Sequence, residues 1–151
     1  RFRIIFRLNI YFYVYNQNIE LTKRLKKMAN DLTENKVMTL LNWSYEKAVQ
    51  GVAGLDSAYD LAEDYMKRND SLYDQANSLI RWQNTKAGTS GFLTGLGGII
   101  TLPIAIPANV ASVMYVQIRM IAAIAHMGGH DLSDDRVKSL VCVYLTGNAA
   151  K

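Results

Sequence analysis

Two histidines and an aspartate in the C-terminal third of the chain come closest to a metal-binding motif. His126 and His130 are four positions apart, and Asp131 follows directly. Histidines at this spacing share one face of a continuous helix and then suit zinc. Gly128 and Gly129 separate them here, and such glycines favour the end of a helix. We therefore predict that His126 ends one helix and Asp131 caps the next, with no metal and no other cofactor.

A second candidate chemistry is phosphate binding by the glycine-rich run at residues 88–98, GTSGFLTGLGG. A P-loop needs a lysine directly after its glycines, yet no lysine lies between Lys86 and Lys138. The run also lacks the third glycine of a dinucleotide-binding loop. Small residues four apart instead let two helices pack closely. The residues predicted for binding or helix packing here are Gly91, Gly95, Gly97, Gly98, Pro103 and Pro107.

The stretch from Ala87 to Ile118 contains no Lys, Arg, Asp or Glu. Such a segment must lie in a protein core, in a bilayer, or move between the two, because a surface helix shows charge to water. Pro107 suits the first position of a helix, and we predict one at about 108–127. Its length of about 30 Å would match a hydrocarbon layer. Arg119 in its middle argues against a simple lipid-facing span.

Arg119 is the most informative single charge, because its neighbours along the chain are apolar. Such a guanidinium must extend to the surface, pair with a carboxylate, or face a polar cavity. The partners expected from the sequence are a lipid phosphate or one of the nearby carboxylates, namely Asp131, Asp134 and Asp135.

Three residues just before the uncharged stretch suggest a membrane boundary. Arg81, Trp82 and Lys86 combine basic charge with a tryptophan, and tryptophan concentrates at membrane interfaces. The alternative is that Trp82 packs in a protein core.

Charge and cysteine content exclude several classes of protein. The 151-residue chain carries a formal net charge of +4. Seven of its 17 Lys and Arg residues lie within residues 1–27, where Glu20 is the only acid. The remainder is slightly acidic, which does not fit a nucleic-acid footprint. A single cysteine excludes both a disulfide framework and a thiolate zinc site.

The first 27 residues form a separate segment with three interpretations. They alternate aromatic, β-branched and basic residues, and Met28 follows. They fit a basic amphipathic arm on an anionic membrane, a strand or hairpin edge, or translated sequence upstream of the native start. We divide the chain into residues 1–27 and a helical domain at 28–151.

The rest of the chain predicts an all-α fold. Thr33 caps a first helix that ends near Gly51, Ser57 begins a second, and Ser71 begins a third that ends at Gly88. A final helix begins at 134 with Asp131 or Ser133 as its cap. The inward-facing residues predicted for these four helices are Val37, Leu40, Leu41, Ser44, Tyr45, Ala48, Ala58, Leu61, Ala62, Tyr65, Met66, Leu72, Ala76, Leu79, Ile80, Gln83, Val137, Leu140, Val141 and Tyr144.

Several short motifs resemble the EcsC protein family over about residues 28–150. They are LIRWQ at 79–83, GFLTGLGG at 91–98, LP at 102–103, PAN at 107–109, QIRMIAA at 117–123, GGHD at 128–131 and DRV at 135–137. The family is named for a bacterial protein encoded beside the subunits of an ABC transporter. Its members are longer than this chain, so the resemblance implies that Lys151 lies inside the domain and that apolar helix surface is left exposed.

The residues and the resemblance together predict a non-catalytic, membrane-associated accessory protein, linked to an ABC transporter or to protein secretion. It would lie at the cytoplasmic side of the bacterial membrane, peripheral or inserted. The Gly/Pro-rich block would form a helical hairpin that docks on its partner, a membrane lipid or a transporter's membrane subunit. The alternatives are a soluble helical module that binds a ligand or partner, and a metal-dependent hydrolase using His126, His130 and Asp131.

Overall fold

The computed structural model describes residues 34–87 and 108–146, and this part of the chain is all-α as predicted. Its helices are α2 (Glu34–Gln50), α3 (Ala58–Met66), α4 (Leu72–Ala87), α6 (Ala108–Met127) and α7 (Asp135–Thr146). The only β-type pairing among the described residues is an isolated bridge between Val52 and Leu55. The helix predicted at 108–127 is confirmed at both ends.

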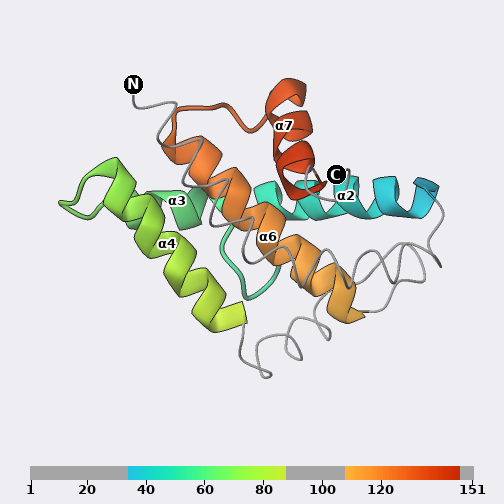
Figure 1. Cartoon of the computed structure of the whole chain (residues 1–151), viewed down its shortest axis with the longest axis horizontal. Coiled ribbons are helices and arrows are strands. Elements are labelled where there is room, and N and C mark those ends of the chain that lie inside the picture. Colours follow the sequence, from blue (N-terminus) through green and yellow to red (C-terminus); the bar gives the residue numbers. More distant parts are fainter. Residues whose placement is uncertain (1–33, 88–107, 147–151) are drawn as a thin grey trace.

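Helix α6 is the centre of the fold. It contacts α2, α3, α4 and α7, which surround it in Figure 1. Nearly every side chain from Ala111 to Ile124 is buried, including the fully buried Tyr115 and Ile118. Since protein covers α6 on all these sides, its lack of charge at 108–118 is explained by core packing. None of the helices that the structure describes is both long and apolar enough to span a membrane.

Helices α4 and α6 pack side by side and run in opposite directions (Figure 1). The segment that joins them, residues 88–107, lies outside the described residues. The glycine and proline candidates at 91–107 belong to this segment, as do the proposed close approach at 91–95 and the helix end at Gly88. The arm at 1–27 and the cap at Thr33 also fall outside the described part.

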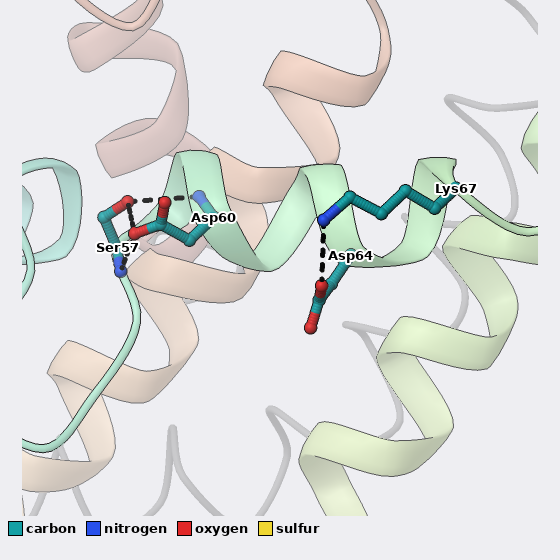
Figure 2. A network of polar contacts seen from close by, with 4 residues as sticks. All are labelled: Ser57, Asp60, Asp64 and Lys67. Carbon is teal, nitrogen blue, oxygen red and sulfur yellow. Dashed lines mark hydrogen bonds and ion pairs between the residues drawn. The ribbon is translucent and has the colours of Figure 1, made fainter.

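Helix α3 begins with the predicted capping box (Figure 2). The hydroxyl of Ser57 accepts a hydrogen bond from the backbone N–H of Asp60, and the Asp60 carboxylate accepts one from the N–H of Ser57, both at 3.1 Å. Near the other end of the helix, Lys67 pairs with Asp64 at 3.5 Å. Ser71 accepts a hydrogen bond from the N–H of Asp74 in the same way, at the start of α4. These side chains satisfy helix N–H groups that lack an intrahelical partner.

A tight turn between α2 and α3 depends on two glycines. Gly51 and Gly54 have φ values of +80° and +82°, which favour residues without a side chain. A Cβ at Gly51 would lie 3.4 Å from the backbone nitrogen of Ser57. The turn returns the chain to α6, and Gly51 ends α2 close to the predicted position.

Three of the local predictions are wrong. Met66 and Leu140 were expected to face inward, yet their side chains are 36% and 52% exposed. Asp134 caps α7, because its Oδ1 accepts a hydrogen bond from the N–H of Arg136 at 2.8 Å. Asp131 instead accepts from the N–H and hydroxyl of Ser133, both at 2.8 Å, and so orders the turn before the helix. In each case the error is one of exact position along the helix. An apolar or capping residue type does not determine which neighbouring position faces the core or caps the helix.

Tyr45 joins α2 to the connection between α6 and α7. Its hydroxyl donates a hydrogen bond of 2.8 Å to the carbonyl oxygen of Leu132, and only 4% of the residue is exposed. The ammonium of Lys138 lies 5.8 Å from the ring centroid. Burial raises the pKa of Tyr45 to about 12, with smaller contributions from Tyr59, Cys142 and nearby aspartates.

Stability should therefore fall at alkaline pH. The pKa of Tyr45 is about 12 in the folded protein against 10.0 as its ordinary value, so the unfolded chain loses its proton first as the pH rises. The contribution of Tyr45 is fully present below pH 10 and is lost as the pH approaches 12. The loss amounts to about 3 kcal/mol at most.

Urea denaturation from pH 8 to 11.5 would measure this loss. Tyr45→Phe should cost about 1 kcal/mol at pH 8 through the lost hydrogen bond, and its stability should decline less steeply above pH 10. Tyr73→Phe is a matched control in a partly exposed position. Equal alkaline slopes for the parent chain and Tyr45→Phe would contradict the account.

Candidate functional site

Arg119 is buried at the centre of the fold, with 4% of the residue exposed. It lies on α6, on the same face as Ser112 and Tyr115, because these residues are spaced by four and three positions. Its guanidinium meets two other parts of the chain. One NH group donates to the carbonyl oxygen of Asp56, before α3, at 2.9 Å, and the other donates to Oε1 of Gln83, on α4, at 3.1 Å.

The partners of Arg119 differ from those expected. The sequence indicated Asp131, Asp134 or Asp135, but both hydrogen bonds go to neutral oxygens. The three aspartates follow the C-terminal end of α6, in the turn, cap and first residue of α7. Two N–H groups of this buried guanidinium are thus satisfied by neutral acceptors, which lowers the cost of burying the charge.

Tyr115 extends the polar cluster around Arg119. The centroid of its ring lies 6.0 Å from the guanidinium carbon, within cation–π range. Burial raises the pKa of Tyr115 and outweighs the lowering effect of the Arg119 charge. The Tyr115 hydroxyl, Nε of Arg119 and the hydroxyl of Ser44 are buried and have no hydrogen-bond partner within the described structure. The cluster connects α6 to α4 and to the segment before α3, so its contacts hold these parts of the fold together.

The histidine candidates do not come together as a metal site. His126 lies at the end of α6 and packs edge-on against Tyr59, with ring centroids 4.8 Å apart. His130 is exposed beyond the break at Gly129, whose φ is +81°. Hydrogen bonds from Ser133 lower the pKa of Asp131, which is also exposed. Among the described residues no group of three or more His, Cys, Asp or Glu could hold a metal ion.

A groove at the protein surface lies between the end of α3 and the middle of α4. We call it the α3–α4 groove, and its volume is about 370 Å³. Its lining residues are Tyr65, Arg68, Ser78, Arg81 and Trp82. Trp82 is 53% exposed, so the alternative prediction that it packs in the protein core is wrong.

The residues of α4 in this groove share one face of the helix. Arg81 and Trp82 lie three and four positions after Ser78, so both share a helix face with it. Gln83, the next residue, points to Arg119 in the core. The buried hydrogen bond of Gln83 therefore sets the rotation of α4 that leaves Trp82 on the surface.

The opposite wall of the groove is held by two interactions. The guanidinium carbon of Arg68 lies 4.2 Å from the ring centroid of Tyr65. The side-chain amide of Gln75, on α4, donates to the carbonyl oxygens of Arg68 at 2.7 Å and Asp70 at 3.0 Å. Gln75 is itself buried, so it fixes the loop that carries Arg68.

Sequence reasoning found part of these sites. It singled out Arg119, Arg81 and Trp82, but neither Gln83 nor Asp56 as partners of Arg119. The available signal for Gln83 was a polar residue on a predicted buried face. No local signal identified Arg68 or the Asp56 carbonyl, because each lies in a connection and is brought into place by packing.

The fold and the Arg119 cluster define the class of domain to which the described chain belongs. The described chain is an all-α domain built around one buried helix that carries a single hydrogen-bonded arginine. A family model matches residues 16–147, and its description is the EcsC protein family. The chain belongs to this family, and the match begins before Met28. No curated protein and no solved structure matched the chain.

The bond between Arg119 and Gln83 should show strong energetic coupling. Replacing Arg119 by Met leaves the Gln83 amide and the Asp56 carbonyl without their donor, at an expected cost of about 2–4 kcal/mol in the free energy of unfolding. A double-mutant cycle with Gln83→Met should give a coupling of about 1.5–3 kcal/mol. Urea denaturation would measure both quantities.

A matched control for this cycle is Arg136→Met, which removes an exposed arginine from α7. It should change the stability by less than about 0.5 kcal/mol. Additive effects of Arg119→Met and Gln83→Met would show that the two side chains do not form the described contact.

Proposed function

We propose that this chain is a non-catalytic accessory protein that binds the surface of a bacterial membrane through the α3–α4 side of the domain. The observation that carries the proposal is Trp82, a large aromatic residue that is 53% exposed on α4. Trp82 lies beside Arg81 and across the groove from Arg68. An exposed tryptophan among arginines suits the interface of an anionic bilayer, where the ring meets headgroups and the arginines meet negative charge.

The burial of α6 supports a proposal in which the folded domain binds the membrane through its surface. The apolar side chains of α6 already pack against α2, α3, α4 and α7. Lipid contact by α6 would require these helices to separate and expose the core. The α3–α4 side needs no such rearrangement, because Trp82 and both arginines are exposed in the folded domain.

The biological setting of the proposal comes from the family. Membership in the EcsC family is the reason to place the protein at the cytoplasmic side and to connect it with an ABC transporter or protein secretion. In this proposal the protein supports a membrane complex and performs no chemistry of its own.

Co-sedimentation of the chain with lipid vesicles tests the proposal. Binding should be stronger to vesicles containing phosphatidylglycerol than to pure phosphatidylcholine, because each arginine near an anionic surface contributes about 1 kcal/mol. Trp82→Ala should weaken binding by about tenfold or more, since its ring loses apolar contact with the interface.

Met38→Ala is the matched control, because Met38 is a similarly exposed apolar residue on α2, at 52% against 53% for Trp82. It should leave binding unchanged. A protein that stays in solution with every vesicle, or loses equal affinity in both variants, would refute the proposal. Binding to native membranes alone, absent from protein-free vesicles, would replace lipid by a membrane protein subunit as the partner.

A further inference from the structure

The α3–α4 groove combines the donors that recognise phosphate. Two guanidinium groups, from Arg68 and Arg81, and the hydroxyl of Ser78 line one groove. Its described lining contains no carboxylate. Guanidinium groups bind phosphate oxygens through paired N–H donors, and such charge-assisted hydrogen bonds are stronger than neutral ones.

The position of Arg68 is prepared before any ligand binds. Its guanidinium carbon lies 4.2 Å from the ring centroid of Tyr65, and such a cation–π contact restricts the orientation of the guanidinium. The Gln75 amide holds the backbone of the same residue at 2.7 Å. Ordering an arginine in advance reduces the entropy lost on binding.

One carboxylate on α3 and one on α4 interact with side chains outside the groove. Asp64 pairs with Lys67 at 3.5 Å, and Asp74 accepts a hydrogen bond from the hydroxyl of Ser71. Neither is a lining residue of the groove. The two arginines therefore determine the sign of the charge that the groove attracts.

From these contacts we infer that the α3–α4 groove binds a terminal phosphate group attached to a small organic group. A volume of about 370 Å³ is within the range of small-molecule sites, and Trp82 offers an apolar wall for the organic part. The phosphate belongs to a lipid headgroup or to a free phosphate compound. A lipid headgroup as the ligand rests on the proposed membrane function. The groove would recognise the phosphate of a lipid headgroup and that of a free compound through the same contacts.

Tryptophan fluorescence gives a direct test, because Trp43 and Trp82 are the only two tryptophans. In a Trp43→Phe background the signal reports on Trp82 alone. The probes are glycerol 3-phosphate, inorganic phosphate, phosphatidylcholine vesicles containing phosphatidic acid, and vesicles with the same charge from oleate. Arg68→Gln and Arg81→Gln remove groove charges, and Lys67→Gln removes a neighbouring charge that does not line the groove.

We expect Arg68→Gln and Arg81→Gln each to weaken binding of phosphatidic acid vesicles by about tenfold or more, the value of one charge-assisted hydrogen bond. Lys67→Gln should change the affinity by less than about threefold. Oleate vesicles should bind less tightly than phosphatidic acid vesicles of equal charge. Circular dichroism of each variant confirms that the helices are intact.

The outcomes separate this inference from the proposed function. Equal binding to oleate and phosphatidic acid vesicles, with similar losses in all three charge variants, would overturn the phosphate site and leave membrane association standing. Binding of glycerol 3-phosphate with the groove-specific losses, but no binding of any vesicle, would support the phosphate site and refute the membrane function. No response to any probe would refute both.

Discussion

The burial of α6 is the constraint on which the rest of the structure depends. Four helices use the same central helix as their packing surface, so their positions relative to one another are set by it. The cost of placing Arg119 in this environment is offset by hydrogen bonds to Gln83 on α4 and to the Asp56 carbonyl before α3. The single charge of α6 between Ala108 and Ala125 thus also holds two neighbouring elements in register.

This arrangement connects the core with the surface. Gln83 is buried against Arg119 while Trp82, one residue earlier, is exposed. Helix α4 therefore cannot rotate to bury the tryptophan without breaking the buried hydrogen bond. On the other side of the α3–α4 groove, Gln75 and Tyr65 fix Arg68. The core contacts give the surface residues a defined geometry, which is the physical basis of the proposed membrane and phosphate contacts.

Much of the fold could be predicted from the sequence, because it depends on local signals. The spacing of apolar residues, the serine caps at Ser57 and Ser71 and the proline at 107 were sufficient to predict the helices. The partners of Arg119 could not be predicted this way, because Asp56 and Gln83 lie 63 and 36 positions away along the chain. Nor could the charge-free sequence alone distinguish a protein core from a bilayer, since both exclude charge. The packing of four helices around α6 shows that this helix lies in the protein core.

Hydrogen exchange followed by mass spectrometry, with and without anionic vesicles, tests the central claim most directly. If α6 is the protein core, its amides at 108–127 should exchange slowly in the absence of lipid, as expected for the most stable part of a domain. New protection on adding vesicles should then be confined to the groove segments near Arg68 and Trp82. Rapid exchange of α6 in solution, with protection appearing only on lipid, would contradict the account and place this helix in the bilayer.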